Sequence, residues 1–324
     1  MKIIPNYQLA VFSEEEYPEK MEIASQQLAQ ARQEGTFAGF DGETLYYEYF
    51  LAEQSRGAVV IVHGLSEFTQ KYHEFAWYLL NQGYDVFLYD QRSHGRSCRL
   101  TPRNDMIHVD AFTDYHKDLH CFVQEVVSKA TTAPLYLYAH SMGGAVAIQY
   151  LAQHPQIFHK AVLSAPMIEP LTGSVSPMFA RLMLGGYLIF GNKKDKFWRS
   201  KEFDPDYPFE RTQDQSRARF QRNMKIRLAE ECYCTTPQSV RWVQQSVSLR
   251  SRLTSKKCLK KIQEPVLMIC AQHDRVVSEK AQEIFAERCP ACQRVVLSDS
   301  THAMLCGTQG VISAHVQQVL NHFG

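Results

Sequence analysis

Residues 136–144, YLYAHSMGG, carry the clearest structural signal in the chain. The apolar residues before the serine are typical of a buried strand, and residues 145–153 have the pattern of a helix. Ser141 lies between them in a small-x-Ser-x-Gly turn, with Ala139 and Gly143 as the small residues. Small side chains there let strand and helix approach closely, which holds the serine hydroxyl on a strained turn above the sheet. We therefore predict a strand, a tight turn and a helix, with Ser141 as a candidate nucleophile.

Similar buried strands recur on both sides of this turn, and helical patterns separate most of them. The predicted strands are 58–63 (AVVIVH), 85–90, 135–139, 161–165, 266–271 and 294–297, after a hairpin within 35–51 that turns at Asp41 and Gly42. Predicted helices include about 72–81, 108–129 and the chain from about 308 onward. Apolar strands that alternate with helices predict a doubly wound, mostly parallel α/β sheet.

One long segment breaks this alternation. From residue 171 to residue 262 no buried strand is predicted, and the pattern is helical with several proline interruptions. An excursion of this length inside a regular α/β chain is best explained as an inserted cap. We expect residues 1–170 to form the first part of the core with an N-terminal extension, 171–262 a helical cap, and 263–324 the second part of the core.

Composition excludes several classes of protein. The 324 residues are 45% hydrophobic, which is too apolar for disorder and sufficient for a large core. Lys and Arg number 35 against 34 Asp and Glu, and this net charge of +1 gives no reason to expect a nucleic-acid partner. The N-terminus lacks the apolar core of a signal peptide, and no run approaches the ~20 residues of a membrane span. We expect a cytoplasmic protein.

Two further polar residues follow strands in a meaningful order. Asp274 follows the strand 266–271 and His302 follows the last strand, so Ser, Asp and His occur in the order that this architecture uses. His302 would take the serine proton, and Asp274 would orient its ring. The backbone amides of Leu65, after the strand 58–63, and of Met142 would form an oxyanion hole.

Other polar residues near these strand ends have alternative interpretations. Glu169 stays open as the acid, because it follows the strand before that of Asp274, whereas Asp299 lies too close to His302 along the chain. Asp90 and Arg92 are expected to form a buried pair that braces the oxyanion loop. The remaining candidates are histidines and cysteines whose spacing fits no metal site, so we expect neither metal nor cofactor: His63, His94, His140, Cys232, Cys234, Cys289 and Cys292.

Together these motifs resemble the α/β-hydrolases of the monoacylglycerol lipase and bacterial lysophospholipase branch, sometimes grouped with serine aminopeptidases. The resemblance covers about residues 35–324 outside most of the cap, although the family usually has glycine at Ser93 and Ala139. The matching segments are 63–64, 67–74, 90–97, 108–119 and 140–144, with Asp274 and His302. The resemblance implies an α/β-hydrolase fold and a serine hydrolase that cleaves the carboxylic ester of a single-chain lipid, a lysophospholipid or a monoacylglycerol.

The predicted cap is basic and partly apolar. Residues 193–261 hold 18 Lys and Arg against 8 Asp and Glu, a net charge of +10, whereas the rest of the chain sums to −9. Residues 178–190 (MFARLMLGGYLIF) contain one charged side chain, Arg181. We interpret this stretch as the lining of an acyl-chain tunnel, and the apolar and basic character of the cap favours a lysophospholipid over a monoacylglycerol. Transient contact with an anionic membrane surface, at the inner membrane face, and simple packing onto the core are the alternatives.

Three other functions stay open. The same triad would serve a small-ester carboxylesterase or an aminopeptidase, although a peptidase would need an acidic group in the cap for the substrate's amine. A non-catalytic ligand-binding protein on this scaffold commonly lacks a triad member, and none is missing here.

Overall fold

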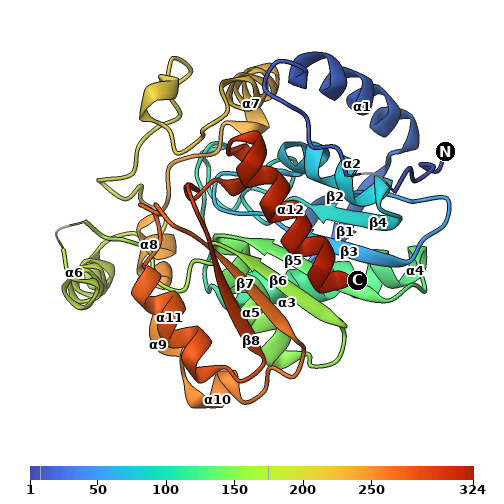
Figure 1. The fold of residues 1–324 in the computed structure, drawn as a ribbon. Helices are drawn as coiled ribbons and strands as arrows, with labels where there is room; N and C mark the ends of the chain where they lie inside the picture. The colour runs from blue at the N-terminus through green and yellow to red at the C-terminus, as the bar shows by residue number, and fades with distance from the viewer. Residues whose placement is uncertain (8, 174) are drawn as a thin grey trace.

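The computed structural model describes residues 1–7, 9–173 and 175–324, and a single eight-stranded sheet lies at its centre (Figure 1). The strand order is β1-β2-β4-β3-β5-β6-β7-β8. The strands are β1 (Gln33–Ala38), β2 (Thr44–Phe50), β3 (Gly57–Val62), β4 (Tyr84–Tyr89), β5 (Leu135–His140), β6 (Lys160–Ser164), β7 (Val266–Ala271) and β8 (Cys292–Leu297). β1 and β2 form an antiparallel hairpin that also pairs antiparallel with β4, and all pairs from β4 to β8 are parallel. The predicted α/β fold is confirmed.

Helices cover both faces of the sheet. On one face α1 (Tyr17–Ala31), α2 (His73–Asn81) and α12 (Gln309–Phe323) share a buried apolar cluster with β3 and β4. On the other face α3 (Thr113–Phe122), α5 (Met142–Gln153) and α11 (Glu279–Arg288) share a second cluster with the same sheet. The shorter elements are η1 (Thr69–Tyr72), η2 (Val123–Val127), α4 (Ser128–Ala130) and η5 (Met304–Cys306). The sheet is therefore shielded on both sides, as its continuous apolar strands require.

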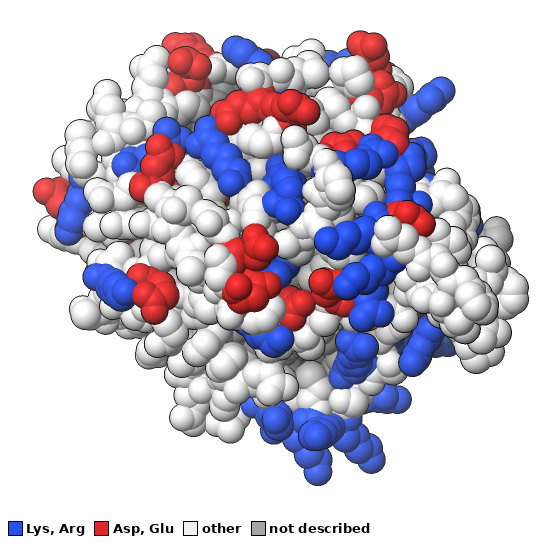
Figure 2. Space-filling view, turned by 180° about the vertical axis from the view of Figure 1, so that it is seen from behind, with Lys and Arg blue, Asp and Glu red and all other residues white. Residues whose placement is uncertain are grey.

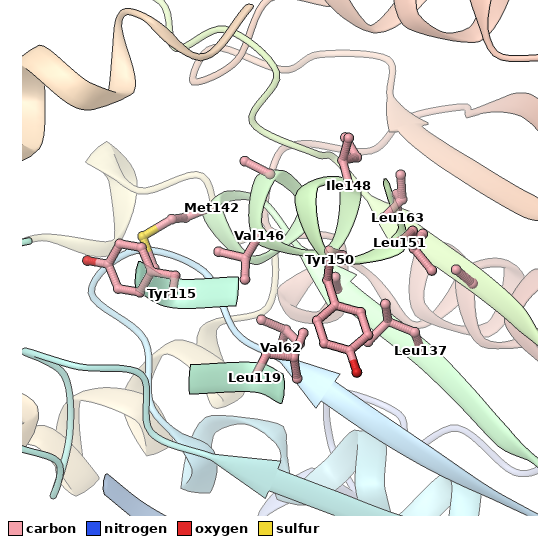
Figure 3. Close-up of a cluster of buried hydrophobic side chains, with 14 of the residues drawn as sticks. Val62, Tyr115, Leu119, Leu137, Met142, Val146, Ile148, Tyr150, Leu151 and Leu163 are labelled. Carbon is pink, nitrogen blue, oxygen red and sulfur yellow. The ribbon is translucent and has the colours of Figure 1, made fainter. Parts of the chain in front are cut away.

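Helix α5, which begins directly after Ser141, is buried from Met142 to Ala152. Figure 3 shows its side chains Val146 and Tyr150 pointing toward Val62 of β3 and Leu119 of α3. Because α5 is apolar over most of its surface, the strands below it and α3 beside it hold it rigidly. This packing fixes the position of the turn from which α5 starts.

The structure differs from the sequence analysis at two helices. The sequence analysis does not predict α1, although Tyr17, Met21, Ala24 and Leu28 recur at helical spacing and are buried. The helix expected over 108–129 begins only at Thr113 and passes into a π-helical turn at η2. Ile107, directly before the predicted helix, pairs with the chain near Gln238, and within the predicted helix the Phe112 amide donates to Gln245 Oε1 at 3.3 Å. These tertiary contacts outweigh the local preference for a helix.

The segment between β6 and β7 contributes no strand to the sheet in its described part, and residue 174 lies outside the described residues. It contains α6 (Pro177–Phe190), η3 (Phe209–Arg211), α7 (Arg217–Ala229), η4 (Glu231–Tyr233), α8 (Val240–Ser246), α9 (Leu249–Leu253) and α10 (Lys256–Leu259). Figure 1 shows α6 projecting from the body, whereas α7 lies beside α1. None of the helices described has the length and apolar character needed to cross a membrane.

Candidate active site

Ser141 occupies a strained turn between β5 and α5. Its backbone has φ 51° and ψ −115°, in a region that non-glycine residues rarely adopt. The turn is held because the Ser141 amide donates to the Ser164 carbonyl at 3.0 Å and its carbonyl accepts from the Met167 amide at 2.8 Å. A Cβ atom at Gly143 would collide with the Val62 carbonyl oxygen of β3. The glycine is thus required by the close approach of strand and helix.

The structure brings together the three residues of the predicted triad. Ser141 Oγ lies 2.9 Å from His302 Nε2, and His302 Nδ1 lies 2.8 Å from Asp274 Oδ2. Asp274 Oδ1 accepts from the amides of Val276 and Val277 at 2.8 and 3.0 Å, which fixes the carboxylate. Each member comes from a loop at the carboxyl end of a strand, so the parallel sheet itself assembles the group.

Of the three acids considered, Asp274 is the one that is hydrogen-bonded to the imidazole ring of His302. Glu169 instead accepts from Arg250 Nη1 at 3.1 Å. The backbone amide of Asp299 donates to the side chain of Gln272, and no bond joins its carboxylate to His302 in the described part of the chain.

Burial and hydrogen bonds together set the protonation states of His302 and Asp274. Burial lowers the pKa of His302 below its ordinary 6.5, and His140 adds to this, while the hydrogen bond to Asp274 opposes it. For Asp274 burial raises the pKa, but the bonds from His302 and from two backbone amides bring it below its ordinary value. At neutral pH the site therefore holds a neutral imidazole beside a carboxylate, the arrangement that a general base requires.

The two predicted oxyanion donors are available for a ligand. Across residues 1–7, 9–173 and 175–324, no protein acceptor takes the amide hydrogen of Leu65 or of Met142. The Leu65 loop is held from below by Glu67, whose carboxylate accepts from the Gly64 amide and from the Tyr72 hydroxyl, both at 2.6 Å. The sequence analysis includes Glu67 in the segment 67–74 that resembles the hydrolase family, but it assigns no role to this residue.

Histidine and arginine side chains fix the surrounding loops. His140 lies 3.2 Å from Glu67 Oε2 through Nδ1 and 3.1 Å from the His302 carbonyl oxygen through Nε2. The expected pairing of Asp90 with Arg92 is wrong, because Asp90 accepts from the amides of Thr69 and Arg96 instead.

Arg92 instead donates hydrogen bonds to Asp118 at 2.5 Å and to Asp41 at 3.0 Å.

Among the described residues no three His, Cys, Asp or Glu side chains converge to hold a metal ion, and all nine cysteines are free.

An apolar cavity of about 450 Å³ opens from Ser141 toward the segment between β6 and β7. Leu65 of the oxyanion loop lines the same cavity as the serine. Most of its wall is apolar: Met167, Pro170, Leu171, Val175, Ala180, Met183, Leu184, Phe197, Trp198, Trp242, Val243, Val247 and Val276. The volume suits a flexible hydrocarbon chain.

Sheet topology, the strained serine turn and the Ser-His-Asp hydrogen bonds define an α/β-hydrolase. The chain matches the family model described as serine aminopeptidase, S33, over residues 53–309 and therefore belongs to that family. This confirms the resemblance found in the sequence and the expected enzyme class, a hydrolase.

Named relatives of this chain act on lipids. Lysophospholipase L2 of Escherichia coli (strain K12) is 30% identical over 265 residues, which cover 79% of this chain and 75% of that protein. Monoglyceride lipase of Saccharomyces cerevisiae is 26% identical over 286 residues, which cover 80% and 82%. The solved structure of a soluble variant of the yeast lipase in complex with a substrate analog matches with a TM-score of 0.72 at 19% identity, over 89% of this chain and 93% of that chain, and shows the shared fold.

Proposed function

We propose that this protein is a serine hydrolase that cleaves the carboxylic ester of a single-chain lipid, with a lysophospholipid preferred over a monoacylglycerol. The observation that carries the proposal is the hydrogen-bonded chain Ser141–His302–Asp274, whose serine lines the apolar cavity. The relatives named lysophospholipase and monoglyceride lipase support the substrate class.

The reaction follows from the protonation states of the site. His302 Nε2 accepts the Ser141 proton while Oγ attacks the ester carbonyl, and the Leu65 and Met142 amides stabilise the oxyanion. The imidazolium then gives its proton to the alcohol, which leaves with the head-group. Water, deprotonated by the same His302, attacks the acyl-enzyme. The imidazolium then returns this proton to Ser141 Oγ as the fatty acid leaves, and Asp274 stabilises the imidazolium in both halves.

We further propose that residues 171–262 form a cap over a core made of 1–170 and 263–324, and that α6 enters the membrane surface transiently. Met178, Leu182 and Phe190 of α6 are 82%, 72% and 95% exposed, which is unusual for large apolar side chains. Because α6 also lines the cavity through Ala180, a lipid leaving a bilayer there would have a short path to Ser141.

The pH dependence of kcat/KM tests the role of His302. The active form needs a neutral imidazole, so activity falls as pH falls through the pKa of His302. Because burial lowers that pKa, the acidic limb is expected to have its midpoint below 6.5. A midpoint at or above neutral pH would argue against this role. Circular dichroism at each pH separates protonation of the site from unfolding.

Narrowing the cavity is expected to select against long acyl chains. In Ala180→Trp the indole would displace about three methylenes of a bound chain, and at about 0.8 kcal/mol each this lowers kcat/KM for a p-nitrophenyl myristate about 50-fold. Hydrolysis of the acetate is expected to change little. Phe179→Trp, on the exposed side of α6, is the matched control. Equal losses on both esters would place the acyl chain elsewhere.

The proposal as a whole is tested by hydrolysis of lysophosphatidylcholine, monoacylglycerol and p-nitrophenyl esters from acetate to palmitate. Faster turnover of long-chain substrates, with the lysophospholipid preferred, is the expected result. Activity confined to the shortest esters, or to amino-acid p-nitroanilides, would contradict it.

A further inference from the structure

A second cavity, of about 290 Å³, lies away from the active site between α3, α5 and the pair α9–α10. It shares none of its described lining residues with the cavity that contains Ser141. Thr113 and His116 of α3 form one wall, and Gln149 of α5 belongs to another. The proposed mechanism uses no group in this cavity, so its chemistry needs a separate explanation.

The opposite wall is strongly basic. Arg252, Lys257 and Lys261 line the cavity, and none of its described lining residues is Asp or Glu. In the part of the chain that the structure describes, none of the three cations forms an ion pair with a carboxylate. Figure 2 shows Lys and Arg side chains gathered at the lower edge of the molecule, at the height where Figure 1 draws α10. Three unpaired cations around one cavity attract an anion.

Buried polar groups at the same cavity lack partners. Gln149 is 8% exposed, and neither its amide oxygen nor its amide nitrogen has a hydrogen-bond partner among the described residues. His116 is also 8% exposed, and its Nδ1 has none. Burial lowers the pKa of His116 to about 4, so its ring is neutral and can donate through one nitrogen. Unpaired buried polar atoms are costly, and a bound ligand would satisfy them.

We propose that this cavity binds a phosphate group, carried either by a small phosphorylated molecule or by a phospholipid head-group. Three cations suit a doubly charged anion better than a single carboxylate, and a guanidinium matches phosphate oxygens in bidentate geometry. The Gln149 amide would donate to a further oxygen. A volume of about 290 Å³ accommodates a phosphate with a few attached atoms.

The position of the site gives binding a structural consequence. α9 and α10 are the last helices before β7, and α5 is the helix that begins directly after Ser141. A bound phosphate would therefore cross-link the end of the segment 171–262 to the helix that follows the proposed nucleophile.

Binding is tested by calorimetric titration of the full chain with inorganic phosphate and with glycerol 3-phosphate at fixed ionic strength, and by flotation with phosphatidylglycerol vesicles. The double variant Lys257→Gln/Lys261→Gln is expected to bind at least about 10-fold more weakly, as the loss of two charge-assisted contacts implies. The matched control is Lys256→Gln/Lys260→Gln, which removes the same charge from the same stretch outside the cavity.

Saturable binding of the soluble phosphates that only the first double variant weakens would support a small phosphorylated ligand. Vesicle binding that only the first variant weakens would support a lipid head-group. No binding in either assay, or equal losses in the two double variants, would overturn the proposal. Ester hydrolysis by the unchanged protein is measured separately, so failure here is distinguishable from failure of the proposed function.

Discussion

The Ser141→Ala variant is expected to lose about 10⁴- to 10⁶-fold in kcat for ester hydrolysis, the range found when a triad nucleophile is removed. Without Oγ no acyl-enzyme forms, and His302 has no proton to accept. Alanine keeps the Cβ atom, so the strained turn at φ 51° is expected to persist. Turnover is measured with p-nitrophenyl decanoate and with lysophosphatidylcholine.

An unchanged melting temperature serves as the control for this variant, because the oxyanion donors and the cavity remain in place. Loss of activity accompanied by unfolding would leave the variant uninformative about catalysis, so Ser141→Cys, which retains a nucleophile of similar size, is measured with it. A folded Ser141→Ala protein that keeps more than about one-hundredth of the activity would exclude Ser141 as nucleophile.

Asp274→Asn is expected to lower kcat about 10⁴-fold at neutral pH while leaving the fold intact. The amide is almost isosteric, but its nitrogen would face His302 Nδ1, where the carboxylate oxygen now lies at 2.8 Å. The ring would then favour the tautomer with its proton on Nε2, which cannot accept from Ser141. The variant would stabilise neither the orientation of the His302 ring nor the imidazolium that forms during the reaction.

The matched control is Glu169→Gln, which removes the other acid that the sequence left open. Since Glu169 pairs with Arg250, this variant is expected to keep kcat within about threefold, as an ion-pair substitution outside the reaction implies. A larger loss in Glu169→Gln than in Asp274→Asn would reverse the assignment of the acid.

The placement of the candidate site was predictable because it depends on topology. Apolar runs identify parallel strands, and the carboxyl ends of parallel strands meet at one edge, so Ser141, Asp274 and His302 had to lie near one another. Sequence order could not distinguish Asp274 from Glu169, because both follow strands at that edge. Only the distances to His302 separate them.

Some side-chain contacts that the sequence did not predict join residues that are distant along the chain. The partners of Arg92 are Asp41 and Asp118, 51 and 26 positions away, and no local pattern indicates either. Glu67 pairs with Lys71 at 2.7 Å and also accepts from the Gly64 amide at 2.6 Å, and the sequence analysis predicted neither contact. Ser93, where the family usually has glycine, adopts φ 62°, so the left-handed turn persists without glycine.

The most direct test of the central claim is covalent labelling with an alkyl fluorophosphonate, read by intact mass and peptide mapping. The account predicts a single adduct, on Ser141, and no adduct in Ser141→Ala. The labelling rate is expected to decrease as the pH is lowered, because His302 becomes protonated. Labelling of another residue would contradict the account. So would a protein that still hydrolyses lipid esters after Ser141 has been fully labelled.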